Sequence, residues 1–306
     1  MQDEIHALGP RWRIFWVQAS DGTALRCGLW TQTPTPSRYV LLSNGRGEYI
    51  EKYAYLPEDI HLDADTAFLT WDHRGQGASG GIRFHIDSYD QFIGDVQKIV
   101  GEVVGQCPYS IVAHSMGSLI VLQGVLEGKL LPQAVFLSAP LLGFPVSPTA
   151  QWAATQFLTI ANRVSWQTKR WLPYGRKKRP FEDNPFTHSP ERYATFLATP
   201  FPSEAMTFGW LLATQQALKK VFQPAMLSRL SIPVHLFVAG DDRVVENTES
   251  LRWVALAQQY APSKPVSTWV NGARHELLFE SEAYYKAVLD PIKTKIGRSG
   301  TPTESG

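Results

Sequence analysis

The chain has few of the features that mark specialised classes of protein. Among its 306 residues only Cys27 and Cys107 are cysteines, which excludes a disulfide framework and fits a reducing compartment. Its 29 basic and 28 acidic residues leave a net charge of +1, so the overall charge does not favour nucleic acid as a partner. The sequence has no run of about 18 consecutive apolar residues, and no membrane-spanning helix is therefore predicted.

The composition and the amino-terminal segment are those of an ordinary globular protein. Hydrophobic residues make up 44% of the chain and charged residues 19%, and the length allows one large core with an inserted subdomain. The opening residues, Met1 to His6, are acidic and lack the apolar stretch of a secretory signal. We therefore expect a cytoplasmic protein.

Short apolar strands alternate with helical segments along most of the chain. The first strands form a predicted β-hairpin that turns at Asp21-Gly22, because Trp12, Ile14 and Trp16 occupy alternate positions before it. Strands are predicted over 12–17, 24–30, 39–42, 67–71, 110–112, 134–137, 234–238 and 266–270, and helices over 51–62, 92–104, 118–126 and 248–260. This alternation predicts an α/β fold with a mostly parallel eight-stranded sheet and helices on both faces.

The alternation stops between two of the strands. Residues 141–223 contain no strand-like run and are rich in aromatic side chains, such as Trp152, Trp166 and Trp210. An insertion of this length predicts a helical cap over 141–223 and a core formed by residues 1–140 and 224–297. The last residues, 298–306, include glycine, serine and proline and are expected to be disordered.

The pentapeptide Ala113-His114-Ser115-Met116-Gly117 lies between a predicted strand and a predicted helix. A serine with small residues two positions before and after it, at a strand-to-helix turn, is typical of a nucleophile elbow. Larger flanking side chains would collide with the backbone of such a tight turn, which holds the serine hydroxyl over the end of the sheet. Ser115 is therefore the candidate nucleophile, with Ala113 at a position where glycine is usual.

A serine nucleophile needs a base, and His275 is the candidate. It follows the last predicted strand, at the carboxyl edge where α/β sheets place their ligands. His114 is adjacent to Ser115, and neighbouring side chains on such a turn point apart. A structural or solvated role is expected for three further histidines, His73, His85 and His235.

Two adjacent aspartates follow the strand predicted over 234–238, and either could be the acid that orients the base. Asp242 is preferred because it directly precedes the Arg243-Val244-Val245 run that starts the next element, and Asp241 is the alternative. The chain order Ser115, Asp242, His275 is that of the α/β-hydrolases and differs from the orders in chymotrypsin and subtilisin.

Two backbone N–H groups are candidates for an oxyanion hole, which would hold the negative charge formed when an ester carbonyl is attacked. One belongs to Met116, directly after the nucleophile, and the other to Arg46. Arg46 lies in the glycine-containing loop Ser43 to Glu48, for which a flexible turn is the alternative interpretation. A second glycine-rich turn, Asp72 to Gly77, lacks the spacing and the ribose acid of a nucleotide-binding motif.

Several of these motifs resemble one branch of the α/β-hydrolases, the bacterial lysophospholipase L2 and monoacylglycerol lipase branch of the serine aminopeptidase S33 type. The segments that carry the resemblance are 44–48 with 51–53, 72–77, 113–117 and 272–280, together with 184–193 and 209–211 in the cap. The resemblance covers about residues 10–290. It departs at Ala113 and at Ser43-Asn44, where a histidine usually precedes the first glycine.

The resemblance implies cleavage of a carboxylic ester through an acyl-serine intermediate, without a cofactor or a metal. The substrate would be a lipid or small ester such as a lysophospholipid or a monoacylglycerol. Two alternatives stay open: a peptidase of the prolyl aminopeptidase kind, and a non-catalytic hydrolase fold used for binding. The sequence carries no signal for an oligomeric state.

Residues 163–179 contain seven basic side chains and no acidic one, interleaved with Trp166, Trp171 and Tyr174. Basic and aromatic residues together can hold a protein at an anionic bilayer surface, at about 1 kcal/mol for each nearby charge. A solvated basic loop is the preferred interpretation, and peripheral contact between the cap and the inner membrane surface is the alternative.

Overall fold

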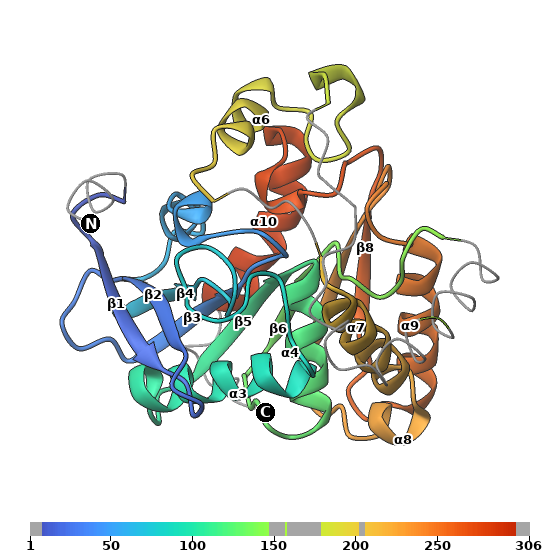
Figure 1. Ribbon diagram of the computed structural model, residues 1–306, viewed down its shortest axis with the longest axis horizontal. Coiled ribbons are helices and arrows are strands. Elements are labelled where there is room, and N and C mark those ends of the chain that lie inside the picture. Colours follow the sequence, from blue (N-terminus) through green and yellow to red (C-terminus); the bar gives the residue numbers. More distant parts are fainter. Residues whose placement is uncertain (1–7, 147–156, 158–178, 202–205, 298–306) are drawn as a thin grey trace, which may run out of the picture.

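The computed structural model describes residues 8–146, 157, 179–201 and 206–297. Its centre is an eight-stranded sheet (Figure 1). In spatial order the strands are β1 (Trp12–Gln18), β2 (Ala24–Trp30), β4 (Thr66–Trp71), β3 (Arg38–Ser43), β5 (Tyr109–His114), β6 (Val135–Ser138), β7 (Val234–Ala239) and β8 (Val266–Val270). Strand β2 is antiparallel to β1 and β4, and the other neighbours pair in parallel. The predicted mostly parallel sheet is confirmed.

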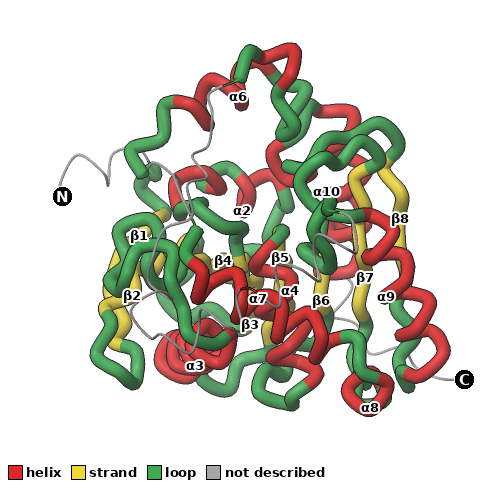
Figure 2. The backbone as a smooth tube through the Cα atoms, turned by 45° about the vertical axis from the view of Figure 1, so that its right-hand side comes forward, coloured by secondary structure: helices red, strands yellow, loops and turns green. Residues whose placement is uncertain are grey.

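Helices cover both faces of the sheet because its central strands carry apolar side chains on both sides. In β3, Leu41 belongs to one apolar layer, whereas Val40 and Leu42 belong to the other, as the alternation of side chains along a strand requires. The first layer includes side chains of α3 (Tyr89–Ile99), α4 (Met116–Leu126), α7 (Phe208–Val221) and α9 (Asn247–Tyr260). The second includes side chains of η1 (Ile50–Tyr53), α2 (Leu56–Asp59) and α10 (Glu282–Gly297). The backbone of α2 and α10 can be followed in Figure 2.

Two of the predicted helices differ most from the observed elements. The single helix predicted over 51–62 is wrong: the 3₁₀ turn η1 is followed by the short helix α2, and Pro57 lies in the first turn of α2, where its missing N–H costs least. Helix α3 starts earlier than predicted because the Ser88 hydroxyl caps it, accepting a hydrogen bond from the Asp90 N–H at 3.1 Å. It continues into the π-helical turn η2 (Val100–Val104).

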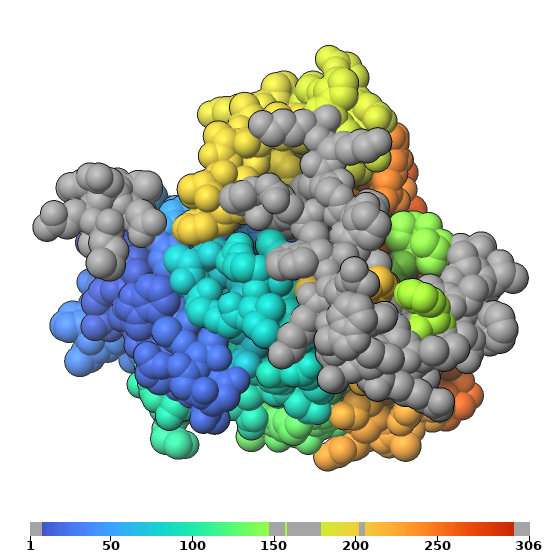
Figure 3. All heavy atoms as spheres, viewed as in Figure 1, coloured from blue at the N-terminus to red at the C-terminus, as the bar shows by residue number. Residues whose placement is uncertain are grey.

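The described part of the predicted insertion carries three helical elements. The turn η3 (Phe181–Asp183) and helix α6 (Pro190–Leu197) belong to the lobe that rises above the sheet in Figures 1 and 3. Helix α7 instead packs Trp210 and Ala213 into the apolar layer that also contains α4. The basic segment 163–179 lies outside the described residues except for Arg179, and so does the tail 298–306.

The parallel strands place their following loops at one edge of the sheet. The loops after β3, β5, β7 and β8 contain the candidate residues, and parallel neighbours end at the same edge. Two short elements complete the described fold, α8 (Pro224–Leu227) before β7 and η4 (Leu277–Phe279) after the β8 loop. Within the described residues, no helix is both long enough and apolar enough to cross a membrane.

Candidate active site

Ser115 occupies the turn between β5 and α4. Its backbone has φ 50° and ψ −116°, an uncommon conformation for a residue other than glycine, and it directly precedes the first turn of α4. The turn requires Gly117, because a Cβ atom there would lie 2.1 Å from the Ser43 carbonyl oxygen at the end of β3. Ala113 is fully buried in β5, so the chain accommodates a methyl group at this position of the elbow.

The structure brings Ser115, His275 and Asp242 together from three strand ends. His275 Nε2 lies 3.1 Å from Ser115 Oγ, and His275 Nδ1 lies 2.7 Å from Asp242 Oδ2. Because an ionised carboxylate can only accept, Nδ1 carries the hydrogen and Nε2 accepts from the serine hydroxyl. The other Asp242 oxygen accepts from the N–H groups of Val244 and Val245 at 2.8 and 3.0 Å. This arrangement can remove the hydroxyl proton as Ser115 attacks a substrate.

The alternative acid and the other candidate histidines have different partners. The Asp241 side chain is half exposed and lies 3.3 Å from Arg243, on the solvent side of the loop. His114, next to the serine, directs its Nδ1 at the Ser138 carbonyl oxygen, 3.1 Å away. His73 contacts the Asn44 carbonyl oxygen. The rings of His85 and His235 contact the hydroxyl groups of Thr207 and Thr268, respectively.

His275 is buried and faces several carboxylates. Burial disfavours the charged imidazole and lowers its pKa, but the carboxylates of Asp242, Glu276 and Glu48 outweigh this effect. The pKa of His275 is therefore raised above its ordinary value. A histidine of raised pKa is a stronger base for the proton of a hydroxyl group.

A buried charge cluster, formed by Glu48, Lys52, His114 and Glu276, lies behind His275. Lys52 Nζ bonds Glu276 at 2.6 Å and also bonds Glu48, and the ring centre of His114 lies 4.9 Å from that of His275. Burial raises the pKa of Glu276, but Lys52 and His114 outweigh it and hold that pKa well below the usual range. Two carboxylates and a histidine also form a ligand set for a divalent cation, and here the Lys52 ammonium takes the place between the carboxylates.

The loop after β3 lies directly against the elbow. The Gly45 N–H donates to the Glu48 carboxylate, and a Cβ atom at Gly45 would lie 3.1 Å from the His114 ring. The Arg46 guanidinium stacks over the rings of Phe84 and Trp210, with its carbon 5.6 and 5.5 Å from the ring centres. These contacts hold Gly45, directly before Arg46, and the side chain of Arg46 itself.

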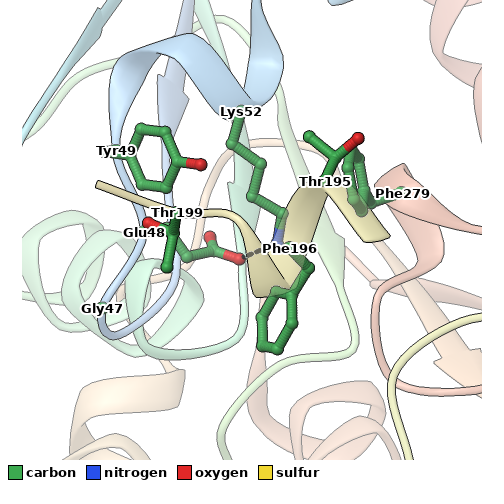
Figure 4. Close-up of a pocket in the computed structure, with 8 residues that line it drawn as sticks. All are labelled: Gly47, Glu48, Tyr49, Lys52, Thr195, Phe196, Thr199 and Phe279. Carbon is green, nitrogen blue, oxygen red and sulfur yellow. Dashed lines mark hydrogen bonds and ion pairs between the residues drawn. The ribbon is translucent and has the colours of Figure 1, made fainter. Parts of the chain in front are cut away.

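A narrow pocket opens beside this loop. Figure 4 shows the Lys52 side chain pointing toward the Glu48 carboxylate. The ring centres of Phe196 and Phe279 lie 5.8 and 5.0 Å from Lys52 Nζ. The pocket lies between the loop, the region of helix α6 and the segment after His275. Its lining residues are Gly47, Glu48, Tyr49, Lys52, Thr195, Phe196, Thr199 and Phe279.

Reasoning from the sequence did not identify the buried charge cluster. Charged residues are almost always exposed unless they are paired, and Lys52 and Glu276 are separated by 224 residues. The one local signal was the position of Glu276 directly after His275, and it does not reveal the partner.

The sheet order and the strand-to-helix elbow at Ser115 define the class of protein, an α/β-hydrolase. A family model described as serine aminopeptidase, S33 matches residues 34–282, and the chain belongs to this family. Lysophospholipase L2 of Escherichia coli (strain K12) is 28% identical over 295 residues, a match that covers 87% of this chain and 82% of the relative.

Solved structures show the same fold. A soluble variant of monoglyceride lipase from Saccharomyces cerevisiae, in complex with a substrate analog, aligns with a TM-score of 0.74 at 18% identity, over 95% of this chain and 97% of that one. A carboxyl esterase from Bacillus coagulans aligns with a TM-score of 0.76 at 17% identity, over 94% and 99% of the two chains. The chain is thus a lipase- and esterase-like hydrolase of the S33 family.

Proposed function

We propose that this protein is a serine carboxylic-ester hydrolase that cleaves lysophospholipids or related monoacylglycerol-like esters through an acyl-serine intermediate. The observation that carries the proposal is the hydrogen-bonded series Ser115, His275 and Asp242, with distances of 3.1 and 2.7 Å. Its chain order is that of serine hydrolases on this fold. The similarity to lysophospholipase L2 supports a lysophospholipid as the substrate.

In the first half-reaction, Ser115 Oγ attacks the ester carbonyl carbon while its proton moves to His275 Nε2. Asp242 stabilises the imidazolium that forms. The carbonyl oxygen becomes an oxyanion, and the N–H groups of Arg46 and Met116 are its proposed donors. The ester C–O bond then breaks, His275 returns the proton to the leaving alcohol, and the acyl group remains on Ser115.

In the second half-reaction, water attacks the acyl-serine carbonyl and gives a proton to His275. The same two N–H groups hold the second oxyanion. When the bond to Ser115 Oγ breaks, His275 returns the proton to the serine and the carboxylic acid leaves. Each step uses only side chains of this protein, its backbone N–H groups and water.

The variant Ser115→Ala tests this mechanism. Loss of the nucleophile is expected to lower kcat for a p-nitrophenyl ester by about 10⁴- to 10⁶-fold. A fluorophosphonate probe should label the unmodified protein at Ser115 and should not label the variant. Full activity in Ser115→Ala would contradict the mechanism, and an unmodified protein that does not label would favour the non-catalytic binding fold.

A hydrolysis panel tests the substrate class. Lysophospholipids, monoacylglycerols, short-chain esters and aminoacyl amides are compared by kcat/KM with one preparation, and Ser115→Ala serves as the blank. We expect the highest kcat/KM for a lysophospholipid. Preferential cleavage of aminoacyl amides would instead support a peptidase of the prolyl aminopeptidase kind.

We further propose that the basic cap holds the protein at an anionic membrane. The support comes from the sequence between residues 163 and 179, of which only Arg179 is described, and this side chain pairs with Asp183 at 3.0 Å. Co-sedimentation should show binding to anionic vesicles that weakens with salt, since salt screens exposed charges. Equal binding to neutral and anionic vesicles would contradict the electrostatic contribution.

A further inference from the structure

The glycine-rich turn from Asp72 to Gly77 packs against the loop 44–50, which carries the Arg46 N–H group. Three buried side chains of this turn hydrogen-bond to backbone groups of that loop: His73 contacts Asn44, Gln76 contacts Gly47, and Asp72 contacts Ile50. These contacts fall at the start, the middle and the end of the loop.

His73 holds the start of the loop. Its Nδ1 accepts from Trp71 Nε1 at 3.2 Å, so its Nε2 carries the hydrogen and donates to the Asn44 carbonyl oxygen at 3.1 Å. Burial lowers the pKa of His73 to about 4, and this neutral tautomer therefore persists at neutral pH. The Asn44 amide in turn donates to the Trp71 carbonyl oxygen at 2.9 Å.

Asp72 holds the end of the loop. Its Oδ1 accepts from the Ile50 N–H at 3.0 Å, and its Oδ2 accepts from the Ala78 N–H at 2.8 Å. The Arg26 guanidinium lies 3.2 Å from the same carboxylate. Gly77 leaves room for it, since a Cβ atom there would lie 2.2 Å from Asp72 Cγ.

Gln76 holds the middle of the loop, beside Arg46. Its side-chain oxygen accepts a hydrogen bond from the Gly47 N–H, which turns the amide nitrogen toward Met116, 3.9 Å from Sδ. Gln76 is 1% exposed, so its side chain has little access to bulk water. One side chain thus contacts Gly47, the residue after Arg46, and also the side chain of Met116. Arg46 and Met116 bear the two proposed oxyanion donors.

We propose that Gln76 is a positioning residue for the oxyanion hole and that the turn 72–77 is the template that holds loop 44–50. The bond to the Gly47 N–H holds the peptide group between Arg46 and Gly47. This restricts rotation about the Arg46 backbone and thereby orients the Arg46 N–H. The inference rests on the proposed esterase function, because it assigns Gln76 to the oxyanion of that reaction.

The variant Gln76→Met tests this role, since it keeps the length of the side chain and removes the strong acceptor. Ser79→Ala, two residues after the turn, is the matched control. The Ser79 hydroxyl accepts from the Arg26 N–H at 2.8 Å and donates to the Asp72 carbonyl oxygen at 2.6 Å, away from loop 44–50. Gln76→Asn, which keeps the amide and shortens its reach, replaces Gln76→Met if that variant does not fold.

Two inhibitors separate positioning from general damage. An acyl trifluoromethyl ketone forms an oxyanion with the serine, whereas an alkyl ether analogue of a lysophospholipid binds without one. In Gln76→Met we expect kcat to fall about 10- to 100-fold with little change in KM, and the Ki of the ketone to rise by the same factor. The Ki of the ether and the acid limb of the pH profile should stay unchanged, as should all these values in Ser79→Ala.

Equal losses of affinity for the ketone and the ether, or no loss for either, would overturn the positioning role. A loss as large in Ser79→Ala would do the same. Failure of the proposed function is distinguishable, because it would appear in the unmodified protein as absent turnover and absent labelling of Ser115.

Discussion

Environment distinguishes two adjacent residues of the same type, Asp241 and Asp242. The Asp242 carboxylate is buried and bonds to His275 at 2.7 Å, whereas Asp241 is half exposed beside Arg243. Two N–H groups, those of Val244 and Val245, hold Asp242 in the orientation that faces the histidine. The two aspartates are the same residue type, and only their surroundings in the fold distinguish them.

Replacing each aspartate by asparagine should separate their roles. Asp242→Asn is expected to lower kcat by about 10⁴-fold, because the amide favours the wrong tautomer of His275. Asp241→Asn is the matched control and should leave kcat within about twofold, as surface changes usually do. Comparable losses in both variants would contradict the assignment.

The pairing of His275 with Asp242 predicts the direction in which activity changes with pH. His275 must be neutral to accept the proton, and its pKa is raised above the ordinary value of about 6.5. Activity of the unmodified protein should therefore fall as the pH drops through a midpoint above about 6.5. Removing the Asp242 charge lowers that pKa, so the residual activity of Asp242→Asn should fall at a lower pH, as measured from kcat/KM profiles.

Among the elements, the contact between the elbow and the end of β3 is the most restrictive. A Cβ atom on Gly117 would lie 2.1 Å from the Ser43 carbonyl oxygen and 2.5 Å from that of Asn44. Both are backbone atoms of the segment that leads into the proposed oxyanion loop, so neither can move alone. Glycine at this position therefore couples α4 to β3.

Gly117→Ala should accordingly destabilise the fold and weaken the reaction. Overpacking of this kind costs about 1–3 kcal/mol in the free energy of unfolding, and the displaced Ser115 should label more slowly with a fluorophosphonate. Gly94→Ala in α3 is the control, since a Cβ atom there meets nothing within 4 Å. It should stabilise the protein by about 0.5–1 kcal/mol in chemical denaturation, and an equal loss in both variants would contradict the packing argument.

Across the whole molecule, Glu280 joins residues 186–188 to the segment that carries His275. Its buried carboxylate accepts from His188 Nδ1 at 2.6 Å, from the His188 N–H at 2.8 Å and from the Arg274 N–H at 3.1 Å. The Glu276 N–H also donates to the Phe186 carbonyl oxygen at 2.9 Å. Residues 186–188 and 274–276 are therefore held together by hydrogen bonds.

Glu280→Ala should loosen this junction. Several buried donors lose their acceptor, at about 1–3 kcal/mol for each donor left unpaired. Hydrogen exchange should accelerate in peptides that cover 184–188 and 274–276 and stay unchanged in β1 and β2. Glu282→Ala is the control, because Glu282 is exposed and its carboxylate pairs with Lys286 across a turn of α10, at 2.5 Å. Uniform acceleration across the chain would contradict a local role.

Local pattern predicted the sheet because each strand is a short apolar run between turn residues. The run Tyr39 to Leu42 became β3, and the strand entering the elbow became β5, at nearly the expected bounds. The helix predicted over 51–62 failed where Pro57 interrupts the backbone hydrogen bonds. Buried strands and proline breaks depend on residues that are close together in the chain, so the sequence shows them directly.

The sequence by itself predicted the candidate nucleophile and the candidate base. Ser115 in its elbow and His275 after the last strand follow from local pattern and chain order. Tertiary structure decided which aspartate faces His275, and it assembled Lys52 with Glu276 and Gln76 with Gly47. These pairs form only when strands that are far apart in the sequence lie side by side. Burial then strengthens the hydrogen bonds and ion pairs between them, and no local sequence pattern shows which residues meet.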